Sequence, residues 1–290
     1  MLANGEGVKG MKKLIFRGLI HRLPQNAMSR TMGKITASRF SRLVIRGYIN
    51  LYKVDVSMIE KPVEEYRTLK EFFTRRLQPH ARPIAEGPEI VVSPVDGTVS
   101  QMGDIDQGTL IQAKGKPYTL LELLGYDAEM AERWYGGRFI TIYLSPRDYH
   151  RIHMPIDGKL IQYTYLPGRL YPVNQLGVEH VDKLFARNER LITYIDSQAV
   201  GCVAMVKVGA LFVGSVKVHY GPATTNVRRG RQVCQAFPET PFYEKGRELG
   251  WFEFGSTVIL LFEKDRLEWA ADVKVGKPLL MGQMLGRAKN

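Results

Sequence analysis

The chain has 290 residues, 44% of them hydrophobic and 24% charged, which is enough to bury a sizeable core and excludes a disordered protein. It has two cysteines and no C-x-x-C pair, which excludes a disulfide framework, and no run of 18 apolar residues, so no membrane-spanning helix is expected. Of the net charge of +12, residues 1–53 carry +10, so an anionic partner, either lipid headgroups or nucleic acid, is expected at this segment.

Residues 11–53 are predicted to form two helices, the second over about 35–53. One side of that second helix is basic and the other is apolar. The basic residues are Arg39, Arg42, Arg46 and Lys53, and the apolar residues are Phe40, Leu43, Val44, Tyr48 and Leu51. Such a helix is typical of a membrane interface, although a core-packing helix with a solvated basic face has the same pattern. The charge segregation favours the membrane.

Residues 56–79 are predicted to form a further helix with Leu69, Phe72 and Phe73 on its inner face, followed by a proline-rich linker. From residue 90 the hydrophobic period changes to two. Strands are expected at 90–92, 98–102, 138–144, 159–165, 191–195, 200–207, 211–220 and 257–263. The sequence therefore predicts an α+β protein with a mainly antiparallel β core and N-terminal amphipathic helices. Residues 1–80 are expected to form the helical, membrane-associating region, and 81–290 the β-rich catalytic domain.

The segment 145–155 carries two histidines. Ser145 can cap a short helix, with Asp148 three residues later, and His150 and His153 would then share one face of it. Two histidines on one face can bind a metal or move protons. No third ligand stands at a familiar spacing, so no metal is expected. Two structural histidines are the alternative.

Two further segments carry polar groups. Asp96 lies in a Val-Asp-Gly turn (95–97), and Gly255-Ser256 leads into an apolar strand; a turn and the start of a strand explain each by itself. Together, Asp96, a histidine and Ser256 can form an orienting carboxylate, a general base and a hydroxyl nucleophile. The Gly-x-Ser-x-Gly motif of the α/β-hydrolases is absent, so the usual scaffold for attack on an external ester is missing.

Five segments, in the same order, resemble the phosphatidylserine decarboxylase family of the bacterial and mitochondrial type. They are Val-Asp-Gly (95–97), Tyr-Leu-Ser-Pro-Arg-Asp-Tyr-His-Arg-Ile-His-Met-Pro (143–155), Leu-Pro-Gly (166–168), Val-Gly-Ala to Val-Gly-Ser-Val (208–216) and Lys-Gly-Arg-Glu-Leu-Gly-Trp-Phe-Glu-Phe-Gly-Ser-Thr (245–257). They span about two thirds of the chain. One departure is Phe254, where bacterial members commonly have Leu.

The resemblance implies autocatalytic cleavage between Gly255 and Ser256 into a large chain, 1–255, and a small chain, 256–290, that stay associated. Asp96, His153 and Ser256 would be the cleavage triad, with His153 the base. Ser256 would become a pyruvoyl group that forms a Schiff base with phosphatidylserine and serves as the electron sink for its decarboxylation to phosphatidylethanolamine. His150 would handle the proton in decarboxylation, and Tyr143 would lie near the substrate.

The same resemblance implies a pyruvoyl cofactor with neither metal nor pyridoxal phosphate, and a homodimer of processed protomers. It implies a peripheral enzyme on the cytoplasmic face of an anionic cell membrane, with the mitochondrial inner membrane as the alternative. Nucleic acid is not an expected partner, because no recognition motif is present. Two other classes stay open at this point. They are a non-enzymatic β-domain that binds membranes or nucleic acid, and a serine hydrolase that uses Ser256 on an external ester.

Overall fold

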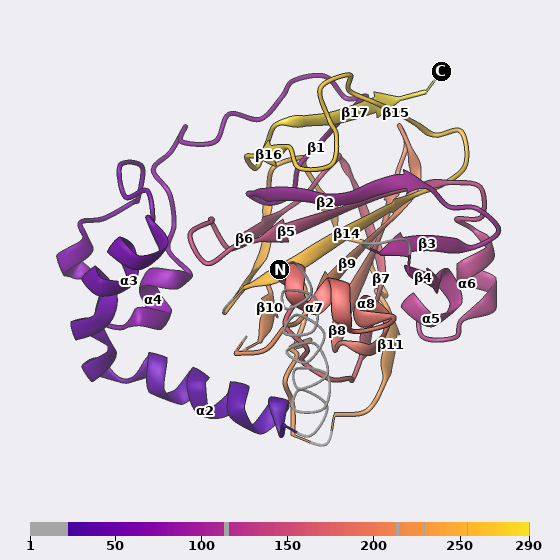
Figure 1. Cartoon of the computed structure of the whole chain (residues 1–290). Helices are drawn as coiled ribbons and strands as arrows, with labels where there is room; N and C mark the ends of the chain where they lie inside the picture. Colours follow the sequence, from indigo (N-terminus) through magenta and orange to yellow (C-terminus); the bar gives the residue numbers. More distant parts are fainter. Residues whose placement is uncertain (1–22, 113–115, 213–214, 229, 254, 290) are drawn as a thin grey trace, which may run out of the picture.

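The computed structural model describes residues 23–112, 116–212, 215–228, 230–253 and 255–289, so the part of the first predicted helix before residue 23 lies outside the described residues. Every strand pair within those ranges is antiparallel, and residues in strands outnumber residues in helices, as in an α+β fold. Figure 1 shows the strands gathered in the body of the molecule and the N-terminal helices at one side. The predicted fold class is confirmed.

A nine-stranded sheet organises the body, with strand order β11-β7-β8-β9-β14-β5-β2-β16 and β12 also paired with β7. These strands are β2 (Gly97–Asp104), β5 (Arg138–Leu144), β7 (Gly158–Leu166), β8 (Arg190–Ser197), β9 (Gly201–Val208), β11 (Val233–Ala236), β12 (Phe242–Tyr243), β14 (Ser256–Phe262) and β16 (Pro278–Leu279). All seven residues of β14 are buried, because β5 and β9 flank it and both faces of the sheet are covered.

Smaller sheets pack with the large one. They are β10-β13-β6, β1-β17-β15 and the hairpin β3-β4. Their strands are β1 (Ile90–Val92), β3 (Thr109–Gln112), β4 (Lys116–Thr119), β6 (Arg151–His153), β10 (Val216–Val218), β13 (Glu248–Phe252), β15 (Leu267–Trp269) and β17 (Met284–Ala288). The strand expected at 211–220 is therefore confined to three residues.

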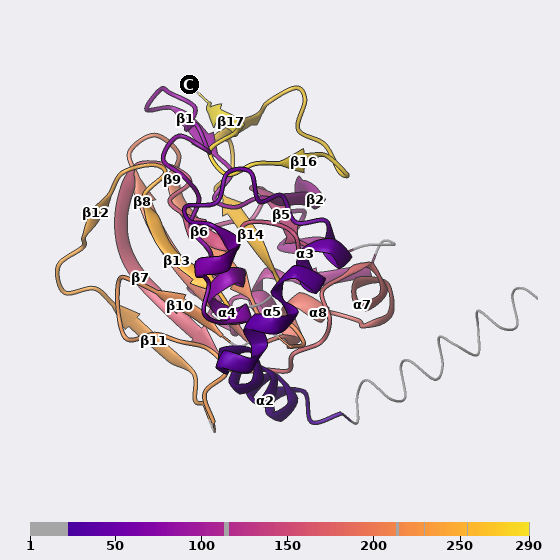
Figure 2. The same cartoon turned by 90° about the vertical axis from the view of Figure 1, so that its left-hand side faces the viewer.

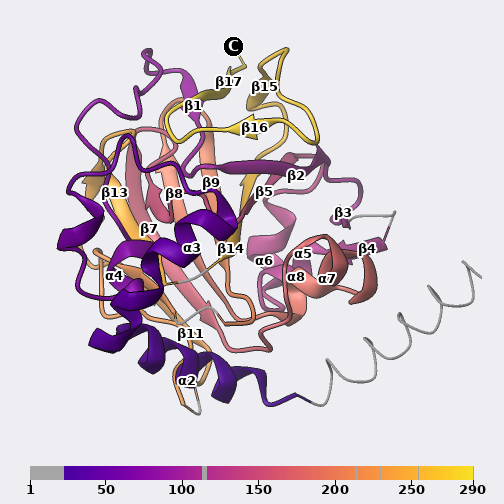
Figure 3. The ribbon, with the colours of Figure 1, turned by 60° about the vertical axis from the view of Figure 1, so that its left-hand side comes forward.

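The large sheet separates two apolar cores. One core contains Ile259 and Leu261 of β14 and the four short helices α5 (Leu120–Leu123), α6 (Ala128–Glu132), α7 (Gln175–His180) and α8 (Leu184–Arg187). The other contains Val258 and Leu260 and the sheets β10-β13-β6 and β1-β17-β15, while the hairpin β3-β4 contributes to the first core. Alternate residues of one strand thus enter opposite cores, which explains why the segment is apolar without a break. Figure 3 shows α5–α8 on one side of the sheet and the N-terminal helices on another.

The N-terminal region consists of α2 (Gln25–Ala37), the 3-10 helix η1 (Arg39–Val44), α3 (Ile45–Tyr52), the 3-10 turn η2 (Val63–Glu65) and α4 (Leu69–Phe73). The single helix expected over 35–53 is interrupted at Ser38, whose extended backbone and side chain cap η1 instead. None of the helices in the described ranges is long and apolar enough to cross a membrane. Figure 2 shows α2, α3 and α4 on the side of the body turned to the viewer.

The helix predicted over residues 56–79 is wrong. Only α4, five residues long, is α-helical there, and Ile59 pairs with Leu77 in an isolated antiparallel bridge. Thr68 begins α4 as its N-cap, because its side chain accepts a hydrogen bond from the Glu71 amide. The predicted inner face is nevertheless buried, since Leu69 and Phe72 belong to a small third core with Ile45.

Candidate active site

Ser256 is the first residue of β14, at the centre of the large sheet, and its side chain is fully buried. Its Oγ atom has no hydrogen-bond partner among the residues that the structure describes. A buried polar group left unpaired costs about 1–3 kcal/mol. Such groups are rare in native proteins and often have a chemical role, so this hydroxyl is a candidate reactive group.

Gly255 lines an apolar groove of about 680 Å³. The groove is also lined by Leu43 and Leu51 of the N-terminal helices, both largely exposed, and by Tyr143 of β5. The backbone of Gly255 is outside the left-handed region, and a Cβ built there would meet only the Leu144 carbonyl oxygen, at an ordinary 3.7 Å. The peptide before Ser256 is therefore reached from the groove without backbone strain at Gly255.

Tyr143 pairs with Thr257, while Leu144 pairs with Ser256. Because alternate residues of a strand point to opposite faces, Tyr143 and the Ser256 hydroxyl lie on opposite faces of the sheet. Burial raises the pKa of Tyr143, so its phenol stays protonated at neutral pH. In the uncut chain, Tyr143 therefore belongs to the groove and the serine hydroxyl to the core behind it.

His153, at the end of β6, is buried and held as a neutral imidazole. Its Nδ1 lies 2.8 Å from the Gly246 carbonyl oxygen, which can only accept, so Nδ1 carries the proton and Nε2 keeps its lone pair. The Tyr149 hydroxyl, 3.1 Å from Nε2, donates to it. Burial lowers the pKa of His153. The ring can therefore accept a proton at Nε2 at neutral pH.

Asp96 lies in the turn before β2 and is buried in an ion pair. Its carboxylate accepts from Arg82 Nε at 2.9 Å and Nη2 at 2.6 Å, and from the Met281 amide at 2.8 Å. Burial lowers the pKa of His153, and the negative charge of Asp96 opposes this lowering through space without reversing it. No hydrogen bond joins Asp96, His153 and Ser256 to one another within the described ranges. The carbonyl of Gly246, rather than Asp96, contacts His153 Nδ1.

The short helix predicted over 145–155 is wrong. The amide and hydroxyl of Ser145 both donate to Asp148 Oδ2, at 2.6 and 2.8 Å, and close a turn. The chain then continues as β6, which pairs with β13. Ser145 and Asp148 therefore make the contact typical of a helix cap, but no helix follows, because the next residues pair in a sheet. His150 and His153 therefore do not share a helical face.

His150 is fully buried, and its Nδ1 donates to the Asp148 carbonyl oxygen at 2.8 Å. Burial, helped by the charge of Arg75, lowers the pKa of His150 to about 3. Its Nε2, like Ser256 Oγ, has no partner in the described structure. Ser256 pairs with Leu144, and the Phe252 amide donates to the His150 carbonyl. Ser256 therefore lies beside Leu144, and Phe252 beside His150, so neighbouring stretches of the chain carry both unpaired groups.

Sequence reasoning missed Arg75, just beyond α4. Its side chain is 4% exposed, and Nη2 donates to the carbonyls of Arg147 and Asp148 at 2.9 and 3.1 Å. It thus shares the Asp148 carbonyl with His150, whose ring also lies 4.0 Å from that of Phe73. Nothing in the sequence pattern separates Arg75 from a solvated arginine such as its neighbour. The C-terminal end of α4 therefore supports the candidate catalytic histidine.

A second missed residue is Glu253, two positions before Gly255. Its carboxylate is buried, accepts from Ser215 Oγ at 2.8 Å and forms an ion pair with Lys70 Nζ at 2.5 Å. Lys70 is part of α4. The segment before the candidate cleavage site is therefore attached to the N-terminal region as well as to the sheet.

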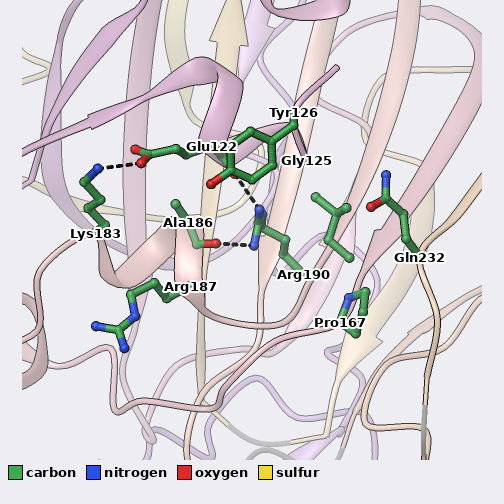
Figure 4. Close-up of a pocket in the computed structure, with 10 residues that line it drawn as sticks. Glu122, Gly125, Tyr126, Pro167, Lys183, Ala186, Arg187, Arg190 and Gln232 are labelled. Atoms are coloured by element: carbon green, nitrogen blue, oxygen red, sulfur yellow. Dashed lines mark hydrogen bonds and ion pairs between the residues drawn. The ribbon is translucent and has the colours of Figure 1, made fainter. Parts of the chain in front are cut away.

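Another cavity, of about 240 Å³, lies beside α5 and α8. Figure 4 shows Arg190 at its centre, with Lys183 bound to Glu122 at the rim. Arg190 donates to the carbonyls of Glu122, Leu123, Ala186 and Asn188 at 2.6–2.8 Å, and so caps the C-terminal ends of both helices. None of the candidate site residues lines it. Arg190 therefore has a structural role, because it joins the ends of α5 and α8.

No cluster of three or more His, Cys, Asp or Glu side chains suited to a metal ion occurs in the described parts of the chain.

Comparison with known proteins identifies the class. The family model described as "Phosphatidylserine decarboxylase" matches residues 69–287. The chain is 68% identical over 279 residues to the phosphatidylserine decarboxylase proenzyme of Brevibacillus brevis, covering 96% of this chain and 100% of that protein. It is 44% identical over 280 residues to the proenzyme of Myxococcus xanthus, covering 95% and 99%. The protein is thus a decarboxylase, a carbon–carbon lyase of a kind made as a proenzyme.

More particularly, the chain belongs to the phosphatidylserine decarboxylase family.

Proposed function

We propose that this protein decarboxylates phosphatidylserine to phosphatidylethanolamine, using a pyruvoyl group that it makes from its own Ser256. The observation that carries the proposal is the buried, unpaired Ser256 hydroxyl directly after Gly255, which lines an apolar groove. The names of the relatives supply the substrate. The groove suits a substrate with acyl chains, because its lining is almost wholly apolar at its exposed end.

The first step we propose is internal cleavage. His153 Nε2 takes the Ser256 hydroxyl proton, and Oγ attacks the Gly255 carbonyl carbon. The ester C–O bond forms as the peptide C–N bond breaks, and the proton passes to the freed amine. Loss of the Cα proton of residue 256 then breaks its Cβ–Oγ bond and releases the Gly255 carboxylate. Tautomerisation and addition of water expel ammonia and leave a ketone at residue 256.

Asp96 is proposed to assist by favouring the protonated form of His153, because its negative charge opposes part of the lowering of the His153 pKa that burial causes. In the uncut chain Tyr149 donates to Nε2, so its hydroxyl must turn away or relay the proton for the attack to occur. Cleavage would also release residue 256 from its pairing with Leu144 and allow it to reach the groove beside Tyr143.

A ketone at residue 256 supplies an electron sink for an amine-bearing substrate that loses carbon dioxide. The chain's own groups fit that chemistry, since His150 Nε2 is buried and its lone pair has no hydrogen-bond partner in the described ranges. We assign His150 to proton handling: it accepts a proton at Nε2 and returns it to the carbon that loses the carboxylate. His153 assists. The proposal assigns no role to a metal ion or to pyridoxal phosphate.

The proposed location is the cytoplasmic face of an anionic cell membrane, with the mitochondrial inner membrane as the alternative. Residues 1–80 form the proposed membrane platform, and 81–290 the catalytic domain. Two of the most exposed large apolar side chains, Phe40 at 82% and Leu43 at 84%, lie on η1 among arginines. This combination favours the headgroup region of a bilayer. We propose no nucleic-acid partner.

The two chains, 1–255 and 256–290, are proposed to stay together after cleavage. The small chain would begin with β14, whose residues 257–262 pair with both β5 and β9. Both of its faces are buried, so separation would expose a wholly apolar strand. Processed protomers are further proposed to form a homodimer.

The test is Ser256→Ala, examined for chain cleavage and for release of carbon dioxide from phosphatidylserine in vesicles. We expect the wild-type protein to give two chains and to release carbon dioxide, and the variant to do neither. A variant that stays uncut and still decarboxylates the lipid would overturn the proposal. Labelling of the mature wild-type enzyme at Ser256 by a fluorophosphonate would instead indicate a serine hydrolase, because a ketone has no hydroxyl to label.

A further inference from the structure

Three arginines line a hollow on the surface of the N-terminal region. Arg39, Arg42 and Arg67 enclose a volume of about 440 Å³, and all three are exposed. None of them lines the apolar groove at Gly255. The hollow is therefore a separate feature from the candidate active site, although both are formed in part by η1.

The 3-10 geometry of η1 brings two of these arginines together. Residues three apart in a 3-10 helix lie one above the other, so Arg39 and Arg42 project from the same face. Arg67 comes from a different segment, directly before the Thr68 cap of α4. The sequence pattern of residues 35–53 does not reveal this third arginine, because only the fold brings it beside the other two.

The acidic side chains of this region are engaged elsewhere. Glu64 forms its ion pair with Arg46, at 2.9 Å, and Glu71 binds Lys61 and the Arg67 backbone amide. Arg42 donates to the Glu64 backbone carbonyl at 2.8 Å, which is a dipole and carries no net charge. Across the described residues, no salt bridge involves Arg39, Arg42 or Arg67. Glu64 and Glu71 act on Arg42 and Arg67 only through space, because each forms its ion pair with another basic residue. The hollow therefore presents three positive charges that no direct ion pair neutralises.

Two exposed apolar side chains of η1 adjoin the hollow. Phe40, between Arg39 and Arg42 in the sequence, is 82% exposed, and Leu43 is 84% exposed. Leu43 and Val44 also line the groove that reaches Gly255. A ligand held by the arginines would therefore lie beside the mouth of the groove. The apolar side chains there would be stabilised by contact with hydrocarbon in place of water.

We propose that Arg39, Arg42 and Arg67 bind the phosphate of an anionic phospholipid other than the substrate, and so hold the mouth of the groove against the bilayer. The planar fork of a guanidinium suits phosphate oxygens. The occupant is a lipid rather than free phosphate, because the adjoining Phe40 and Leu43 would be covered only by a molecule with acyl chains. This inference rests on the membrane location in the proposed function and adds a discrete site to it.

The experiment compares the processed wild-type enzyme with a triple variant, Arg39→Gln, Arg42→Gln and Arg67→Gln. A matched control removes the same charge from exposed lysines outside the N-terminal region, by Lys264→Gln, Lys274→Gln and Lys289→Gln. Sedimentation measures binding to three kinds of vesicle: phosphatidylcholine alone, phosphatidylcholine with phosphatidylglycerol, and phosphatidylcholine with a fatty acid, which is anionic without phosphate. A fourth arm adds inorganic phosphate at constant ionic strength.

We expect the arginine variant to bind phosphatidylglycerol vesicles at least ~10-fold more weakly than wild type, and the lysine control to change much less. If both triple variants lose the same amount of binding, the effect comes from overall charge, and the proposed arginine site is wrong. If wild type binds fatty-acid vesicles as tightly as phosphatidylglycerol vesicles, the site does not recognise phosphate. If inorganic phosphate displaces the protein from phosphatidylglycerol vesicles, the occupant is free phosphate and not a lipid.

Dispersed short-chain phosphatidylserine separates this inference from the proposed function. The arginine variant should cleave itself and turn over that substrate as wild type does, since none of its arginines contacts the candidate active site. If wild type fails to turn it over, the proposed function is wrong. If turnover is normal and the arginine variant still binds phosphatidylglycerol vesicles like wild type, only the present inference is wrong.

Discussion

Lys207 allows a quantitative test of the core around β14. It is fully buried on β9, opposite Val258, and its Nζ donates to Thr193 Oγ1 at 2.5 Å and to the Met205 carbonyl at 3.2 Å. No salt bridge of Lys207 occurs in the described structure. Burial lowers the pKa of Lys207 from 10.5 to about 7. A depressed pKa in a base means that folding opposes its protonation.

The effect of Lys207 on the free energy of unfolding, and its dependence on pH, follow from its lowered pKa. Between pH 7 and 10.5 the unfolded chain binds one more proton at Lys207 than the folded chain, so the free energy of unfolding rises with pH. At 1.36 kcal/mol per pKa unit, the buried amine costs on the order of 4 kcal/mol at pH 7. Lys207→Met removes this cost and loses two hydrogen bonds, so we expect a net gain of roughly 2–4 kcal/mol at pH 7.

The assay is urea unfolding of the Ser256→Ala protein with and without Lys207→Met, because an uncut chain can unfold in one reversible transition. The stability difference between the two should shrink by about 2 kcal/mol from pH 7 to pH 9, since the wild-type lysine becomes easier to bury as fewer protons are available. A difference that does not depend on pH would refute the reasoning.

Further predictions concern the histidines and their supports. His153→Ala and Asp96→Ala should slow internal cleavage at least ~100-fold on denaturing gels, and normal processing in either variant would remove its proposed role. Because the pKa of His153 is lowered, the cleavage rate should stay constant as pH falls to 6.5 and decline only below it; a decline centred above 6.5 would contradict this. His150→Ala should cleave normally but lower kcat by about 10²–10⁴, and unchanged turnover would contradict its assignment. Arg75→Met should raise the pKa of His150 in an NMR titration and lower kcat, while Arg75→Lys, which keeps the charge, should restore both; an unmoved pKa would mean that Arg75 does not position His150.

The antiparallel core could be predicted because its signals are local. The strand expected at 138–144 matches β5, and that at 257–263 differs from β14 by one residue. Alternating or continuous apolar runs between turn residues leave few other structures for such segments. The wrong predictions lie where pairing with a distant strand determines the structure in place of a local sequence signal. Ser145 and Asp148 do form a capping contact, but β13 takes up the following residues as a strand.

The site could be predicted only as a set of residues. Motifs predict Asp96, His150, His153 and Ser256 as candidate site residues, yet their partners come from distant segments that no spacing rule connects. The carbonyl of Gly246 binds His153, and Arg75 shares a carbonyl with His150. Backbone carbonyls are present at every residue, so a sequence cannot show which of them will orient a side chain.

The most direct test of internal cleavage at Ser256 is the intact mass of the purified protein. We expect two species, residues 1–255 and a 35-residue chain 256–290 whose first residue carries a ketone in place of its amine and a methyl group in place of its hydroxymethyl group. A single uncut polypeptide that nevertheless releases carbon dioxide from phosphatidylserine, or a small chain that still begins with serine, would contradict it.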